Sequence, residues 1–294
     1  SHPPRRLTRP YLVASTLTLL LAVVATSVGL FVPDFYRDAE VLLPQLYGQD
    51  LLTLGIAVPT LAGALYYAHQ GSLQGYVVWL GVTGYLLYTY ASYAFLTAFN
   101  ELYLVYVALF ALTLFTLIGG IARIDPTDLK EALDGHPVRG YVAFQALVAG
   151  LVALMWLAEV GPASLAGTRP PSIAETTLPV PVIQSLDLGV VVPSFALSAA
   201  FLWKQRAWGY VFTGVLLVKG TTLGLAVLAM IVFMLRNSQT VPLPQIVLFA
   251  LLSLTGLGLT TRFIRAISRS SSRTQPHART ETQPDWARST DTTL

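Results

Sequence analysis

One apolar stretch limits what this chain can fold into more than any other feature. Residues 208–234 carry a single charge, Lys219, near the middle of the stretch. A helix needs about 20 apolar residues to cross the roughly 30 Å hydrocarbon core of a bilayer. The stretch is therefore predicted to be a transmembrane helix with a lysine at mid-depth. Because a cation there costs about 2.5–3.5 kcal/mol, Lys219 is expected to face other helices or water, away from lipid.

The composition of the whole chain agrees with this interpretation. Of the 294 residues, 54% are hydrophobic and 11% are charged, whereas a soluble domain is about 25% charged. The sequence therefore predicts an all-α integral membrane protein with no room for a soluble catalytic domain. There is no cysteine and the four histidines are scattered, so we expect no disulfide, no metal site and no cofactor.

Other apolar runs extend the prediction to eight transmembrane helices. The expected spans are 11–31, 51–69, 75–99, 102–124, 141–159, 186–203, 208–234 and 246–267. A short interfacial helix is expected near residues 41–47, and the proline-rich segment 160–184 is expected to be an outside loop. Asp125 or Thr127 is a candidate helix cap in the polar connector that follows the fourth span.

The basic residues predict the orientation in the membrane. An even number of spans places both termini on one side, and lysine and arginine favour the cytoplasm. Of the 18 basic residues, all but Arg37, Arg169, Lys219 and Arg236 fall on that side. We therefore predict a plasma (inner) membrane protein with both termini cytoplasmic. The expected units are a basic cytoplasmic tail (1–10), a first four-span half (11–124), a cytoplasmic connector (125–140), a second four-span half (141–267) and a disordered cytoplasmic tail (268–294).

The two expected halves resemble each other in sequence. Residues 51–62 (LLTLGIAVPTLA) align with residues 185–196 (SLDLGVVVPSFA), a shift of 185 minus 51, or 134 residues. In the same register the Gly-Tyr-Val string at 75–77 falls on the one at 209–211. Four spans is an even number, so the sequence predicts two parallel four-helix repeats. In transporters with internal repeats, sites tend to lie at the repeat interface near the midplane.

Lys219 is the leading candidate for a functional residue. The 134-residue register places Tyr85 opposite Lys219 and Thr53 opposite Asp187. Lys219 is interpreted either as half of a structural ion pair with Asp187 or as a ligand-binding, proton-coupling or Schiff-base group. Retinal is disfavoured because no carboxylate lies mid-span as its counter-ion. We expect the ammonium to point toward the outer half of the bundle and to find oxygen partners among tyrosine hydroxyls and Asp187.

Further candidates share the depth of Lys219. By helical spacing Tyr88 lies on the face of Tyr85, with Thr89 beside it, and these residues form either a pocket wall or hydrogen bonds to neighbouring helices. Pro59 and Pro193 each free a backbone carbonyl, which could line a cavity or permit a kink.

Carboxylates at expected span boundaries are interpreted as a cation-attracting vestibule or, more simply, as solvated span ends: Asp50, Glu101, Glu159 and Asp187.

Catalytic motifs are missing from the sequence. It contains no GxGxxG, Walker, HExxH or GxSxG pattern, so no catalytic residue is assigned and an intramembrane enzyme ranks last among the hypotheses. Arginines at and beyond the last span, among them Arg262 and Arg265, are expected to anchor that span to anionic lipid. Nucleic-acid binding is not expected.

Four stretches resemble a family of uncharacterised prokaryotic multi-pass membrane proteins. They are GQDLLTL, HQGSLQGYVVWLGVTGYLLYTYASYAF, FNELYLVYVALFALTLFTLI and WGYVFTGVLLVKGTTLGLAVLAM. The resemblance implies a multi-span fold, and it transfers no activity and no site residue.

Two hypotheses follow for function. The first is a transporter-like protein, or a protein that binds a small molecule or lipid, with a polar site between the halves near Lys219. The second is a non-catalytic membrane sensor or assembly partner in which the Lys219 ion pair is purely structural. Membrane lipids are expected partners of either. A pocket that reaches Lys219 would favour the first hypothesis, and a closed bundle would favour the second.

Overall fold

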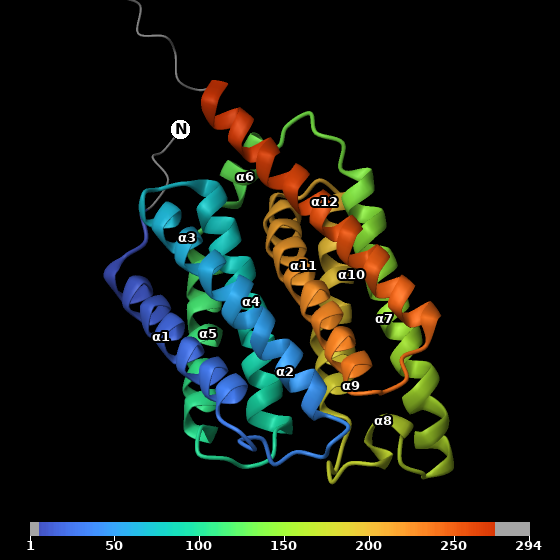
Figure 1. Ribbon diagram of the computed structural model, residues 1–294. Helices are drawn as coiled ribbons and strands as arrows, with labels where there is room; N and C mark the ends of the chain where they lie inside the picture. Colours follow the sequence, from blue (N-terminus) through green and yellow to red (C-terminus); the bar gives the residue numbers. More distant parts are fainter. Residues whose placement is uncertain (1–5, 274–294) are drawn as a thin grey trace, which may run out of the picture.

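The computed structural model describes residues 6–273, and within them it contains helices and no strand (Figure 1). Six long helices are uninterrupted: α1 (Arg9–Phe31), α4 (Leu73–Leu96), α5 (Tyr103–Arg123), α7 (Arg139–Ala166), α11 (Ala207–Arg236) and α12 (Leu243–Arg273). Two more continue through a π-helical turn: α2 (Leu43–Leu52), η1 (Thr53–Ala57) and α3 (Val58–His69), and then α9 (Val182–Leu186), η2 (Asp187–Val191) and α10 (Val192–Trp203). The remaining helices, α6 (Pro126–Ala132) and α8 (Pro171–Ala174), are short.

Seven of these helical segments are long and apolar enough to cross a membrane. They are α1, α2–α3, α5, α7, α9–α10, α11 and the part of α12 up to Ile267. The prediction of an all-helical, multi-pass membrane protein is therefore confirmed. The expected third span, α4, is 24 residues long but less apolar, because tyrosine, threonine, serine and glycine occupy many of its positions.

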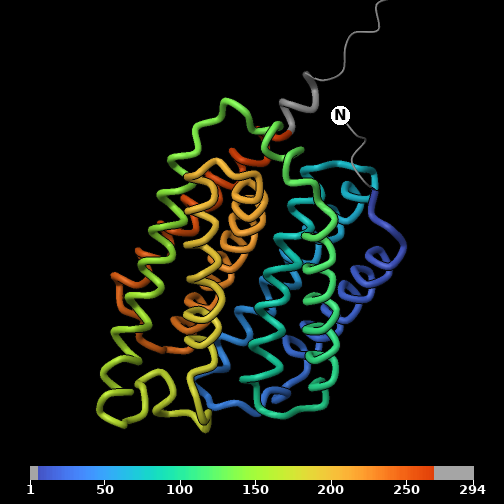
Figure 2. The backbone as a smooth tube through the Cα atoms, turned by 180° about the vertical axis from the view of Figure 1, so that it is seen from behind, coloured from blue at the N-terminus to red at the C-terminus, as the bar shows by residue number. Residues whose placement is uncertain are grey.

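The less apolar helix α4 lies at the centre of the bundle, beside α11. Figures 1 and 2 show α1, α3 and α5 on the α4 side, and α7, α10 and α12 on the α11 side. Helix α2 packs across the centre against α11, and α9 packs against α4. Because α4 is surrounded by other helices, most of its residues are buried within the protein, and its polar side chains meet protein and not lipid.

The two ends of the bundle differ in charge. The end at the top of Figure 1 carries residues 6–8, the turn at Gly71, the connector with α6 and the end of α12. We call it the basic face, since it includes Arg123, Lys130, Lys204, Arg262 and Arg265. The other end, the opposite face, carries α8 and the loops 32–42, 97–102 and 237–242.

The turns at the basic face follow from local sequence. Gly71 and Gly135 adopt positive φ angles of 88° and 74°, which glycine adopts without the steric penalty of a Cβ. Ser72 caps α4 by accepting a hydrogen bond from the backbone N–H of Gly75. Asp125 likewise accepts from the N–H of Thr127 at 2.9 Å, which confirms Asp125 as the cap of the connector helix.

Two sequence-based boundaries were wrong. The second membrane segment begins at Leu43 and not at residue 51, because Pro44 in the first turn starts a helix that runs on into the apolar stretch. The expected interfacial helix at 41–47 is therefore part of this segment, and Asp50 lies inside it. Helix α7 extends to Ala166, well past the predicted end at 159, so the following loop is shorter than predicted and includes α8.

Close helix contact at Gly48 gives a first testable prediction. A Cβ at Gly48 would meet backbone atoms of Met230 in α11 within 2.5 Å, so Gly48→Val must push α2 away from α11. Overpacking of this kind costs about 1–3 kcal/mol. We expect a lower thermal unfolding midpoint in detergent, measured by circular dichroism. Gly63→Val is the matched control, since a Cβ there meets nothing within 4 Å; an equal loss in both variants would contradict the prediction.

Candidate functional site

Lys219 lies in the centre of the bundle and is almost completely buried. It projects from α11 past Gly84 of α4, and a Cβ built at Gly84 would lie 3.7 Å from the Lys219 Cγ. Only 6% of Lys219 is exposed. Its Nζ has no hydrogen-bond partner within the described residues and lies 4.5 Å from the centre of the Tyr88 ring. The observed interaction of this group is thus a cation–π contact, where oxygen partners were expected.

Asp187 is held by two neutral donors. The Tyr88 hydroxyl donates to its Oδ1 at 2.9 Å, and the Trp156 indole N–H donates to its Oδ2 at 2.7 Å. The direct Lys219–Asp187 ion pair considered from the sequence is absent; the ion pair among the described residues joins Arg37 and Glu101. Tyr88 instead connects the two groups, because its hydroxyl bonds to Asp187 while its ring contacts Lys219.

A neutral cluster of hydroxyl and amide side chains joins α2 and η1 to α4. Thr53 Oγ1 lies 2.9 Å from the Tyr85 hydroxyl. The Gln49 amide donates to the Tyr85 hydroxyl at 3.1 Å and to Thr89 Oγ1 at 2.6 Å. All four side chains are buried. The structure therefore brings Tyr85 and Thr89 together as predicted candidates, and Gln49 is a member that sequence reasoning missed.

The π-helical turns place Thr53 and Asp187 at the start of η1 and η2. In each turn the backbone N–H five residues later, of Val58 or Val192, bonds to the carbonyl of that first residue. The next residue is Pro59 or Pro193, which has no N–H to donate. Both prolines are exposed on the outside of the bundle, so their rings do not line the site.

A second buried carboxylate, Asp50, was interpreted from the sequence only as part of a vestibule or as a solvated span end. Asp50 is 1% exposed and accepts hydrogen bonds from the hydroxyls of Tyr36, at 2.5 Å, and Tyr93, at 2.9 Å. Burial, and then the Asp50 charge, raise the pKa of Tyr36 well above its ordinary value, so Tyr36 keeps its proton and is the donor. The interpretation of Asp50 as a solvated span end was wrong, since its helix starts seven residues earlier, at Leu43.

The loop that brings Tyr36 over Asp50 is held in place by the two residues that follow the tyrosine. Arg37 forms an ion pair with Glu101, and Asp38 Oδ1 accepts a hydrogen bond from the N–H of Ala98 at 2.8 Å. Burial raises the pKa of Asp38, an effect that this hydrogen bond partly offsets. The loop therefore covers the opposite face above Asp50.

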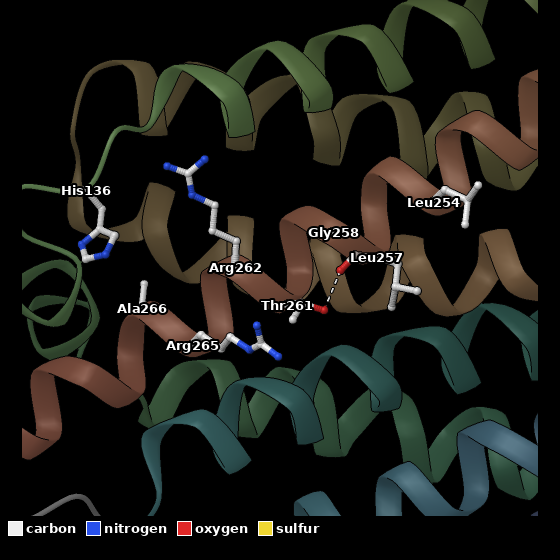
Figure 3. Close-up of a pocket in the computed structure, with 8 residues that line it drawn as sticks. All are labelled: His136, Leu254, Leu257, Gly258, Thr261, Arg262, Arg265 and Ala266. Carbon is white, nitrogen blue, oxygen red and sulfur yellow. Dashed lines mark hydrogen bonds between the residues drawn. The ribbon is translucent and has the colours of Figure 1, made fainter.

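A pocket at one end of the bundle lies away from this polar layer. It has a volume of about 650 Å³ and lies at the basic face, lined by residues of α12 and by His136 (Figure 3). Lys219, Asp187 and Tyr85 are not among its lining residues. These three side chains are at most 9% exposed, so the polar layer is closed to solvent in this arrangement.

These observations define the chain as an all-helical, multi-pass membrane protein, and residues 6–273 contain two buried carboxylates and a buried lysine without a hydrogen-bond or ion-pair partner. No protein-family model, curated protein or solved structure matches the chain. Any assignment of a role to these residues therefore rests on their geometry and chemistry.

Proposed function

We propose that the chain is a transporter-like membrane protein whose polar layer around Lys219 binds a small anionic solute or lipid headgroup between two parallel four-helix halves. The observation that carries the proposal is the unpartnered Lys219 ammonium, 6% exposed in the middle of a membrane-spanning helix. A group so costly to bury is a functional-site candidate by default. It keeps all three N–H donors available for a ligand oxygen.

The two-half architecture is supported by helices that begin at equivalent positions in the two halves. Helices α3 and α10 begin at Val58 and Val192, and α4 and α11 begin at Leu73 and Ala207; each pair differs by the same 134 residues (192 minus 58, and 207 minus 73). The π-helical turns at Thr53 and Asp187 obey the same shift. Since π-turns are rare and often occur at functional sites, their recurrence at equivalent positions favours a duplicated origin.

Side-chain contacts also recur between the halves. The Trp79 indole donates to Ser15 at 2.9 Å, and Gln145 donates to Thr213 at 3.0 Å. Thr213 follows Trp79 by 134 residues, and Gln145 follows Ser15 by 130, the shift that also aligns Tyr11 with Tyr141. In each half, therefore, a hydrogen bond joins the first span to the third, although the side chains that form it differ. By the same register, the neutral Thr53–Tyr85 pair corresponds to the charged pair Asp187 and Lys219.

We infer that α4 is an eighth span. It starts at the basic face after Ser72 and ends at the opposite face before Thr97, and the spans on either side of it are joined to it by short turns. At about 1.5 Å per residue, its 24 residues are long enough to cross the bilayer. With eight spans the basic face is cytoplasmic by the distribution of lysine and arginine.

The location of Lys219 suggests how a solute would reach it. Helices α4 and α11 meet at Gly81, where an added Cβ would touch Val218 and the Val215 carbonyl. Separation of the two helices at this contact would expose Lys219 and Tyr88 to water from one side. The π-turns before Pro59 and Pro193 are interruptions of the α-helical pattern at the same depth, and such interruptions are where spans bend.

A non-catalytic sensor or assembly partner is the second candidate function. The observation that favours it is the closed packing of the polar layer, in which the Asp187 oxygens already have donors and the described pocket lies elsewhere. In this alternative the buried polar groups specify the helix packing, and Lys219 never meets a solute.

Cysteine accessibility separates the two functions. The sequence contains no cysteine, so Gly84→Cys introduces a single thiol beside Lys219, where a Cβ makes ordinary contacts. In sealed vesicles of defined orientation, a transporter-like protein is expected to react with a membrane-impermeant anionic methanethiosulfonate from at least one side, since the proposed solute is an anion. The sensor alternative predicts labelling only after unfolding in dodecyl sulfate.

Two control variants calibrate this labelling. Gly63→Cys lies in open space on the outside of α3, in a lipid-facing position where a thiol without water should stay unreactive. Phe99→Cys, at a residue 74% exposed in the loop after α4, should react from the opposite face only. Labelling of Gly63→Cys at the rate of Gly84→Cys would mean that the reagent does not report a solute path.

A further inference from the structure

One surface of α12 changes from apolar to basic along its length. Leu254, Leu257, Gly258, Thr261, Arg262 and Arg265 recur at three- and four-residue spacing, which places them along one side of the helix. All six line the 650 Å³ pocket together with Ala266 and His136 (Figure 3). Leu254 and Leu257 are 64% and 43% exposed, so the apolar end of the pocket faces lipid.

The basic end of this pocket carries two arginines, Arg262 and Arg265. Within the described residues, neither Arg262 nor Arg265 forms an ion pair or hydrogen bond with another side chain. The His136 Nδ1 is shielded from solvent and has no hydrogen-bond partner among residues 6–273. Figure 3 shows Arg262 extending on the His136 side of α12 and Arg265 on the other. Both arginines are exposed, so a rotamer change can bring Arg265 to a shared anion.

We propose that this pocket binds an anionic phospholipid, with its phosphate held by Arg262, Arg265 and His136 and an acyl chain along Leu254 and Leu257. From residue 254 to residue 265 the helix rises about 16 Å, enough to follow a lipid from its headgroup into the upper part of its acyl chain. Arginine matches the geometry of phosphate oxygens. The site is separate from the polar layer, and it does not depend on the proposed function.

A free phosphate ion would use only the basic half of the pocket. The lipid is favoured because the lining continues into exposed leucines, and a free ion has no apolar part that would pack against them. Gly258 lies between the two halves, and a Cβ there meets nothing within 4 Å. A bulky side chain at this position would therefore obstruct the acyl chain without disturbing the protein or its charge.

The test measures lipid binding to the purified full chain in detergent by native mass spectrometry. The probes are dioleoylphosphatidylglycerol, dioleoylphosphatidylcholine with the same acyl chains, and inorganic phosphate as a competitor. We expect Arg262→Gln/Arg265→Gln to raise the dissociation constant for phosphatidylglycerol about 25-fold, at roughly fivefold for each arginine. The charge-matched control Lys130→Gln/Lys204→Gln, at two exposed lysines of the same face, should change it by less than about twofold.

A second variant tests the apolar half independently. Gly258→Phe is expected to weaken phosphatidylglycerol binding with both arginines intact, whereas Gly63→Phe, at an open position on α3, should not. The proposal is overturned if the two double variants lose affinity equally, since this would show only a general surface charge effect. It is also overturned if Gly258→Phe binds phosphatidylglycerol as tightly as the unaltered chain does. A third contrary result is that millimolar inorganic phosphate displaces bound phosphatidylglycerol as effectively as added phosphatidylglycerol does, since the site would then be one for a free anion.

Discussion

Alanine in place of Asp50 is expected to lower the free energy of unfolding by about 2–6 kcal/mol. The carboxylate is the acceptor for the buried hydroxyls of Tyr36 and Tyr93, and stranding a buried donor costs about 1–3 kcal/mol. The three side chains are at most 5% exposed, so water cannot easily replace the lost acceptor. The loss should appear as a lower midpoint in thermal or dodecyl-sulfate unfolding, followed by circular dichroism.

Matched variants identify the cause of this loss. Asp50→Asn keeps one acceptor oxygen and should lose less stability than Asp50→Ala. Tyr93→Phe combined with Asp50→Ala should cost less than the sum of the single changes, because each removes the same hydrogen bond. Glu40→Ala, an exposed carboxylate in the same loop, should be near neutral. An Asp50→Ala protein as stable as the unaltered chain would contradict the cluster's structural role.

Asp50 also illustrates what could not be predicted from the sequence. The apolar pattern locates spans by their lipid-facing residues, so the polar string Gly-Gln-Asp at 48–50 marked an apparent boundary. In the structure this string faces α4 and α11, and Gln49 and Asp50 are satisfied by tyrosine and threonine hydroxyls on α4. Polar residues that are hydrogen-bonded to a neighbouring helix can lie within a span, so they do not mark its end. Recognising it requires knowing which helices are neighbours.

The polar face of α4 could be predicted, but its partners could not. Helical spacing placed Tyr85, Tyr88 and Thr89 near each other, and each makes an inward-facing hydrogen bond. The Trp156 donor to Asp187 comes from α7, far away in sequence, and no local pattern indicates this contact. The orientation of Pro59 was equally hidden, because a π-turn adds one residue to the turn and so rotates every later side chain by about 100° relative to an α-helix.

The second large effect is expected at Lys219. Replacing this residue by methionine should maintain or raise thermal stability, by up to about 1–3 kcal/mol, because exchange of a buried charge for an apolar side chain of similar length is often stabilising. Asp187 keeps its two donors, Tyr88 and Trp156, in this variant. A structural ion pair makes the contrary prediction: Lys219→Met should be destabilised, and Asp187→Asn in the same chain should partly restore its stability.

The Asp187 variants complete the comparison. Asp187→Ala strands the Trp156 N–H and the Tyr88 hydroxyl and should cost about 2–6 kcal/mol, at about 1–3 kcal/mol for each stranded donor. Asp187→Asn can still accept from Trp156 and donate to Tyr88, so its loss should be small. Lys204→Met, at an exposed position in the turn before α11, controls for charge removal and should be neutral. A stable Lys219→Met protein beside a destabilised Asp187→Ala protein would mean that the fold requires the carboxylate and not the lysine. Since the lysine adds no stability in that case, its presence in the centre of the bundle would be explained by what it binds.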